Sequence, residues 1–151
     1  MLQAFSTSAT RVDISSRYRT IFFPSLPGEG HGDYEARAVS DLQKAHAGFD
    51  RIDAKRLRLP GVQSDPDGLF LRLKSRELII IEAKKHQRDF ADGTAQLVQY
   101  YAQAKHSEFS GFSVQLILVT SKNSQTSGYA LWEQWLKSHR DFAVFANGQP
   151  L

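Results

Sequence analysis

The spacing of apolar residues along the chain predicts an opening helix. Between Asp33 and Gly48, apolar side chains recur every three to four positions, which places them on one face of an amphipathic helix. Asp33 is positioned to cap this helix and Gly48 to end it. The preceding segment 24–33, PSLPGEGHGD, contains two prolines and three glycines and therefore predicts a loop.

A different pattern, in which apolar and polar residues alternate, follows this helix. Residues 49–61 alternate and end on a Pro-Gly pair, which predicts a strand with one face in water. Residues 68–73 and 77–84 predict two further strands, and the short polar link between them favours an antiparallel hairpin. The three strands together would form a meander.

The second half of the chain returns to helical spacing before its longest apolar strand. Residues 93–105 predict a helix capped by Asp92, and residues 113–121 form a continuous apolar strand, typical of burial on both faces. A crossover helix between two strands implies parallel addition to the sheet. Residues 129–139 predict another helix and 142–148 another strand. The sequence therefore predicts an α/β fold: helix, three strands, helix, strand, helix, strand, with a mixed central sheet flanked by helices.

Length and composition indicate one soluble domain. The 151 residues suffice for a single core, with an N-terminal extension and loop (1–32), a core (33–121) and a peripheral helix and strand (122–151). No apolar run approaches the roughly 18 residues of a membrane helix, so no membrane association is expected. The absence of cysteine excludes disulfides and thiolate metal sites and fits a cytoplasmic location.

The charge balance points weakly to a polyanionic partner such as DNA. The formal net charge is +3. Two groups of basic residues lie on segment 49–61 and just after segment 77–84: Lys55, Arg56, Arg58, Lys85, His86 and Arg88. They either draw in a phosphate backbone or form a solvated sheet edge. The five histidines are scattered without metal-ligand spacing, so no zinc site is expected.

The strand 77–84 ends on charged residues although its ELIII stretch is typical of a strand buried on both faces. Alternate side chains of a strand share a face, so Glu82 and Lys84 are neighbours on one surface. Asp67 starts the preceding strand, beside the end of 77–84 in a hairpin, so we expect Asp67 and Glu82 to meet. The alternative is a solvated strand end with a surface ion pair of little energetic value.

Two neighbouring carboxylates repel each other unless a cation lies between them. Asp67, Glu82 and the carbonyl of Ala83 would supply an oxygen-rich site for Mg²⁺, with Mn²⁺ as a substitute. Lys84 would orient or deprotonate an attacking water, or stabilise charge in the transition state. These are the groups that phosphodiester hydrolysis requires.

The same residues resemble a known nuclease signature. "PDG", followed fourteen residues after Asp67 by "IEAK", resembles the Pro-Asp…(Asp/Glu)-x-Lys motif of the PD-(D/E)XK nuclease superfamily, over roughly residues 33–121. The resemblance implies a restriction-endonuclease-like core of a helix, three strands, a helix and a strand, an order that the apolar pattern predicts independently. It implies that Asp67 and Glu82 bind metal, that Lys84 is catalytic, and that the products carry a 5′-phosphate and a 3′-hydroxyl.

Two further residues lie on the helix after this motif. Gln96 and Tyr100 are four positions apart and share one helical face. "IEAKK" with a downstream "QLVQYYAQ" is most similar to the nuclease domain of type I restriction endonuclease motor subunits. There such a pair would support the active site or touch DNA. The alternative is a helix face packed on the sheet, with Tyr100 in the core.

Two more acids are candidates near the metal. Glu35 lies in the first helix, where many members of the superfamily place an acid that reaches the metal directly or through water. The alternative for Glu35 is a surface residue paired with its helix neighbours. Asp65, two residues before Asp67, either shares the metal or forms the turn.

These features predict a Mg²⁺-dependent nuclease acting on DNA, of restriction or DNA-processing type. The first helix is also similar to the opening helix of archaeal Holliday junction resolvases, and a resolvase would work as a homodimer that cuts opposed strands. A third alternative is a catalytically silent DNA-binding or assembly module of the same fold within a larger restriction or repair complex.

Overall fold

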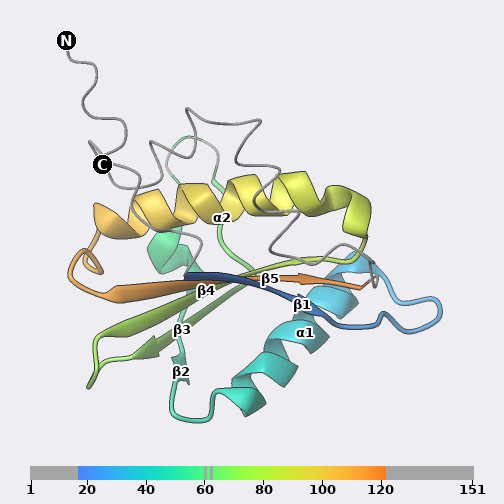
Figure 1. Cartoon of the computed structure of the whole chain (residues 1–151), viewed down its shortest axis with the longest axis horizontal. Coiled ribbons are helices and arrows are strands. Elements are labelled where there is room, and N and C mark those ends of the chain that lie inside the picture. Colours follow the sequence, from blue (N-terminus) through green and yellow to red (C-terminus); the bar gives the residue numbers. More distant parts are fainter. Residues whose placement is uncertain (1–16, 60, 62, 122–151) are drawn as a thin grey trace.

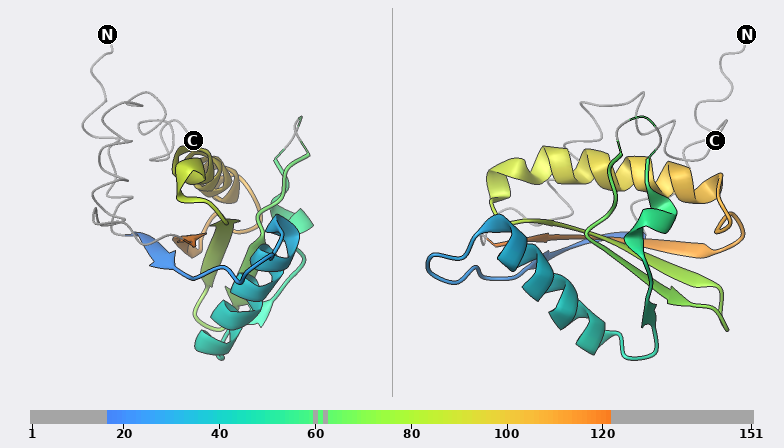
Figure 2. Two further views of the ribbon diagram at one scale, coloured as in Figure 1. Left: turned by 90° about the vertical axis from the view of Figure 1, so that its right-hand side faces the viewer. Right: turned by 180° about the vertical axis from the view of Figure 1, so that it is seen from behind.

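The computed structural model describes residues 17–59, 61 and 63–121 and shows a mixed five-stranded sheet between two helices (Figure 1). The strand order is β1-β5-β4-β3-β2. The strands are β1 (Tyr18–Phe22), β2 (Asp50–Arg51), β3 (Gly68–Arg72), β4 (Glu77–Lys84) and β5 (Ser113–Thr120). Helices α1 (His31–Ala45) and α2 (Phe90–Lys105) cover opposite faces of the sheet (Figure 2). The predicted α/β class with a mixed sheet is confirmed.

Strand β4 is the centre of the sheet and explains the apolar run in the sequence. Its residues from Leu78 to Ala83 are all buried, since both faces of the strand are covered. Odd-numbered β4 side chains join the core beneath α1, which contains Tyr34, Ala38, Val39, Leu42, Phe70, Ile79, Ile81, Ala83, Ile117 and Val119. Even-numbered apolar β4 side chains, such as Ile80, join the larger core beneath α2. The site-bearing strand is thus fixed from both sides.

The predicted strand pairings are present. β3 and β4 form an antiparallel hairpin with Gly68 opposite Ile81, and β5 pairs with β4 in parallel after the α2 crossover. β2 pairs antiparallel with β3 and completes the meander. One strand, β1, was absent from the predicted element order; it lies before α1 and pairs in parallel with the outer side of β5.

The prediction of one strand over residues 49–61 is wrong. Only Asp50–Arg51 pairs as β2, and Ala54–Leu57 then forms a short 3-10 helix, η2. Asp53 starts this turn because its side chain accepts a hydrogen bond from the Lys55 amide at 2.9 Å. Aspartate favours such local caps over a strand ladder, and this preference overrides the alternating pattern.

The predicted helix boundaries also need correction. α1 begins two residues before Asp33, after Gly30, and ends with His46 as the C-cap rather than at Gly48. α2 begins at Phe90 after Asp89, so Asp92 is not its cap. Both Asp33 and Asp92 lie in the first turn instead, where a negative charge stabilises the helix through its dipole.

The predicted helix 129–139 and strand 142–148 fall outside the residues that the structure describes, as does most of the N-terminal extension. Among the described residues, no helix is both long enough and apolar enough to cross a membrane.

Candidate active site

Asp67 is fixed at the open end of the β3–β4 hairpin. Its amide donates to the Ile81 carbonyl at 3.0 Å, although Ile81 is already the register partner of Gly68, so the regular pairing stops at Gly68. Its Oδ2 accepts a hydrogen bond from the Ala83 amide at 2.7 Å. These two bonds hold Asp67 beside the end of β4 that carries Glu82, and the charge of Asp67 raises the pKa of Glu82.

Glu82 and Lys84 project from β4 on one face, toward α2. The Lys84 Nζ lies 3.4 Å from Glu82 Oε2, and the Glu82 side chain is only 5% exposed. The second oxygen, Oε1, is buried and has no hydrogen-bond partner among the described residues. A charged carboxylate oxygen that is buried without a donor is costly, so a proton or a cation at this position would stabilise Glu82.

Burial raises the pKa values of both acids. The pKa of Glu82 rises to about 8 because of its burial and, second, the negative charge of Asp67, while Lys84 opposes the shift. Burial also raises the pKa of Asp67 to about 6, although its hydrogen bond from Ala83 lowers it. One positive side chain therefore does not compensate two buried acids, and Glu82 retains a proton at neutral pH unless a cation joins the site.

The donor set fits a hard divalent cation. In an antiparallel pair the N–H and C=O of one residue point to the same neighbour, so the Ala83 carbonyl is directed toward Asp67, as its amide is. Two carboxylates and a carbonyl are typical ligands of Mg²⁺ or Mn²⁺, with water in the other positions. Within residues 17–59, 61 and 63–121, no three His, Asp or Glu side chains form a ready metal cage. A metal ion bound here would therefore take some of its ligands from water and the others from the protein.

Glu35 reaches this site from the other layer of the fold. It lies one turn into α1 and is half-buried, and burial raises its pKa while the charge of Lys84 lowers it. Its own charge raises the pKa values of Asp67 and Glu82. Glu35 is therefore close enough to influence the site electrostatically, as expected for an auxiliary acid rather than for a residue paired within its own helix.

Tyr100 supports the loop that leads into Asp67. It is fully buried in α2, and its hydroxyl lies 2.6 Å from the Ser64 Oγ, three residues before Asp67. Gln96, one turn earlier on the same helix, is half-buried, and its Oε1 has no hydrogen-bond partner in the described part of the chain. The complete burial of Tyr100 in the core beneath α2 fits the alternative of a helix face packed on the sheet and excludes direct contact with DNA, while its hydroxyl contacts the segment before Asp67.

Asp65 has a different partner. Its carboxylate forms a two-pronged ion pair with Arg58, at 2.6 and 3.2 Å. This ion pair lowers the pKa of Asp65, so the group is charged and compensated by Arg58. It therefore stabilises the segment before Asp67, and its charge is not free to attract a metal ion.

Sequence reasoning missed two residues that shape the site. Ser64 was not singled out, because nothing in its neighbourhood indicates a partner on α2. Gly93 is buried in α2, where a Cβ atom would lie 2.6 Å from Leu118 Cδ1 and 3.0 Å from Lys84 Cγ. The helix can therefore lie directly on the stem of Lys84. The sequence predicted Gly93 as the first residue of this helix and so gave no signal of the close approach, whereas in the structure α2 already begins at Phe90.

Comparison with known proteins identifies no relative: no protein-family model matches the chain, and searches of curated proteins and of solved structures returned no match.

Proposed function

We propose that this chain is a Mg²⁺-dependent nuclease that hydrolyses DNA phosphodiester bonds, with a core of the restriction-endonuclease type. One observation carries the proposal: Asp67, hydrogen-bonded to the Ala83 amide, lies near a buried Glu82 whose other neighbour is Lys84. The observed order of α1, β2, β3, β4, α2 and β5 supports the same core.

The side chains divide the chemistry between them. Asp67, Glu82 and the Ala83 carbonyl would hold the divalent ion, which when bound polarises the phosphate and neutralises developing charge. Lys84 would orient the water that attacks phosphorus, and the bond from phosphorus to the 3′ oxygen would break. Glu35 adds negative charge near the ligands, while Tyr100 keeps Asp67 in place through Ser64.

Basic residues next to the site support DNA as the substrate. His86 and the exposed Arg88 follow β4 directly, and His31 at the start of α1 lies with its ring centroid 5.2 Å from that of His86. More than fifty residues lie between these two histidines in the sequence, so their proximity in the fold was not predictable. Phosphate contacts of this kind position a nucleic acid without reading its sequence.

Cleavage assays with a matched pair of lysine variants test the proposal. Purified protein is incubated with plasmid, linear and branched DNA in Mg²⁺ or Mn²⁺, beside Lys84→Ala and Lys74→Ala. Lys74 lies on the exposed turn at the other end of the same hairpin. We expect cleavage by the wild type and by Lys74→Ala, and its loss in Lys84→Ala. Equal behaviour of all three proteins would reject catalysis and favour the silent DNA-binding module.

Assembly state and substrate preference distinguish the resolvase alternative from the proposed nuclease. A resolvase would be a dimer at micromolar concentration in light scattering and would prefer the branched DNA. Cleavage of plasmid and linear DNA by a monomer would exclude it.

A further inference from the structure

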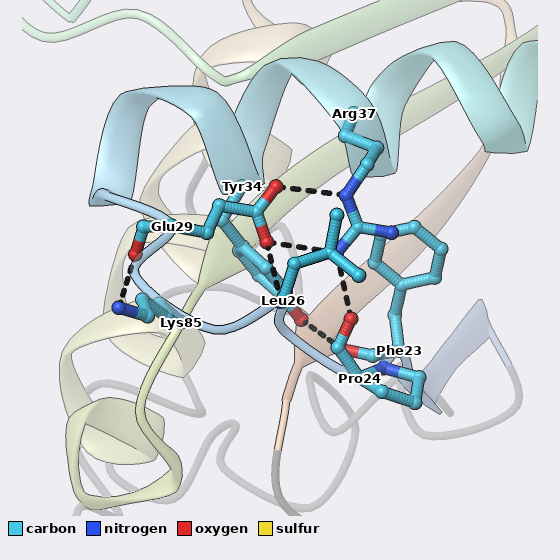
Figure 3. Close-up of polar contacts among 7 residues, drawn as sticks. All are labelled: Phe23, Pro24, Leu26, Glu29, Tyr34, Arg37 and Lys85. Atoms are coloured by element: carbon cyan, nitrogen blue, oxygen red, sulfur yellow. Dashed lines mark hydrogen bonds and ion pairs between the residues drawn. The ribbon is translucent and has the colours of Figure 1, made fainter.

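The N-terminal end of α1 determines where Glu35 lies, yet it lacks the usual side-chain cap. Its N-cap residue, Gly30, contributes no side chain, and no side-chain cap hydrogen bond is formed there. The first helical turn must therefore be held by other contacts. These contacts come from the loop of residues 24–30, which runs between β1 and α1 (Figure 3).

Glu29 is the centre of this loop. Its two carboxylate oxygens accept hydrogen bonds from Arg37 Nε and Nη2, each at 2.8 Å, and Oε1 also accepts from the Leu26 amide at 2.9 Å. The Glu29 side chain is only 6% exposed. Arg37 Nη2 donates a further bond to the Pro24 carbonyl at 2.7 Å. The pair thus joins both ends of the loop to the second turn of α1.

The same residue also connects the loop to the catalytic strand. The backbone carbonyl of Glu29 accepts a hydrogen bond from Lys85 Nζ, and Lys85 is the neighbour of Lys84 (Figure 3). Beside Glu35, the hydroxyl of Tyr34 donates to the Phe23 carbonyl at 2.7 Å. Glu29 is therefore bonded to α1 through its side chain and to the end of β4 through its backbone.

We propose that Glu29 and Arg37 are positioning residues for the active site, an inference that rests on the proposed nuclease function. Their ion pair fixes the first turn of α1 against the end of β4, so that Glu35 faces the site of Asp67, Glu82 and Lys84. Neither residue touches the reacting groups. They act through Glu35 and through the Lys85 contact.

The ion pair is a permanent connection and not a pH switch. The hydrogen bonds from Arg37, with that from Leu26, lower the pKa of Glu29 to about 2. Both partners are therefore charged throughout the physiological pH range. The guanidinium also lies over the Phe23 ring, 4.3 Å from its centroid, which further restricts its orientation.

The chain offers a matched control in a second two-pronged pair. Arg56 Nε and Nη2 bind the Glu108 carboxylate at 3.2 and 2.8 Å, with both side chains largely exposed. This pair joins η2 to the segment after α2 and contributes nothing to the position of α1. Arg56→Gln thus removes an arginine–glutamate pair without the proposed effect.

The experiment compares Arg37→Gln, Glu29→Gln, their double variant and Arg56→Gln in the full chain. Mn²⁺ binding is measured by calorimetry, and DNA cleavage is measured against Mn²⁺ and against DNA concentration. We expect the Mn²⁺ concentration for half-saturation to rise about 10-fold or more in the Arg37 and Glu29 variants, as for other supporting residues of metal sites. The KM for DNA should stay unchanged, and Arg56→Gln should match the wild type.

The double variant and a conservative variant separate positioning from folding. If the two residues act as one unit, the double variant loses no more Mn²⁺ affinity than either single variant. Arg37→Lys keeps the charge and one donor, so it should recover part of the affinity and remain folded. Thermal melting shows which variants are folded.

Two results would contradict the inference. The first would leave the proposed nuclease function intact, and the second would reject it as well. Folded Arg37→Gln or Glu29→Gln protein with wild-type Mn²⁺ affinity and cleavage would reject the positioning role and leave the nuclease intact. A wild-type protein that neither binds Mn²⁺ nor cleaves DNA would reject the nuclease function and this inference together.

Discussion

The two ends of β4 carry one glutamate each, and the two residues have opposite properties. At the hairpin turn, Glu77 accepts hydrogen bonds from Ser75 and Arg72, which lower its pKa. At the open end, burial raises the pKa of Glu82 to about 8, and one of its oxygens has no hydrogen-bond partner among the described residues. The first carboxylate is compensated within the protein, whereas the second is not. The difference makes Glu82, and not Glu77, the candidate functional carboxylate of this strand.

The largest expected effect is a difference in cleavage between the variants in which each of these two glutamates is replaced by glutamine. Glu82→Gln would remove a proposed metal ligand. The cleavage rate should therefore fall by more than the roughly 10- to 100-fold that is typical when a residue supporting a metal ligand is changed. Glu77→Gln should leave cleavage unchanged and lower the melting temperature only slightly. Cleavage rates and thermal melts of both variants check the comparison, and equal losses of activity would remove the distinction between the two ends.

The pH dependence of stability should also distinguish Glu82 from Glu77. In metal-free protein the folded state keeps the Glu82 proton up to a pKa of about 8, while the unfolded chain releases it near the ordinary value of 4.5. The contribution of Glu82 to stability is therefore greatest below the lower of these values and falls as pH rises between them, by up to about 1.4 kcal/mol per pH unit. Asp67 adds a fall of the same sign below its pKa of about 6.

Urea unfolding at pH 5, 7 and 9 measures this slope. Glu82→Gln should flatten it, and saturating Mn²⁺ should flatten it in the wild type, because the ion favours the charged carboxylates. Glu77→Gln should retain the wild-type slope. A metal-free protein whose stability rises from pH 5 to 9 would contradict the buried acid pair.

A smaller effect is expected where α2 lies on Lys84. The methyl group of Gly93→Ala would collide with Leu118 and with the stem of Lys84. Such overpacking typically costs about 1–3 kcal/mol, and the displaced Lys84 should lower the cleavage rate. Gly32→Ala is the matched control, since a Cβ there meets nothing within 4 Å. It should leave cleavage unchanged, and a similar loss of activity in both variants would argue against the Lys84 contact.

The smallest effect should come from the hydrogen bond between Ser64 and Tyr100. Ser64→Ala leaves the buried Tyr100 hydroxyl without this partner and should cost about 1 kcal/mol of unfolding free energy. Tyr100→Phe should cost less, because the half-buried Ser64 can turn to water. Urea unfolding of both single variants and the double variant checks this order, and strictly additive losses would show that the bond contributes nothing.

Much of the fold follows from local pattern. The hairpin of β3 and β4, the α2 crossover and the parallel addition of β5 were predictable because each depends on spacing within one short segment or on its immediate neighbour. The proximity of Asp67 to Glu82 also followed from the hairpin, because the start of β3 lies beside the end of β4. The hydrogen bond of the Asp67 side chain to the Ala83 amide, which fixes this position, was not predictable from the register.

The remaining features depend on partners distant in sequence or on competition with local caps. The ion pair of Glu29 with Arg37 and the bond of Ser64 to Tyr100 join loops to helices, where no periodicity constrains the partner. The turn at Asp53 replaced a predicted strand because one side chain satisfied a backbone amide. The pKa values of the two acids required burial on both sides of β4, which local sequence does not reveal.

The burial of β4 between two helical layers has a consequence for how activity appears during folding. The β3–β4 hairpin can form locally, but its acids then remain in water and repel each other only weakly. Their low-dielectric environment exists only once α2, made later, packs over them and α1 brings Glu35 near. A nascent chain that has completed only the hairpin therefore lacks the environment that raises the pKa values of the two acids, and the proposed nuclease activity would appear only when the last layer packs.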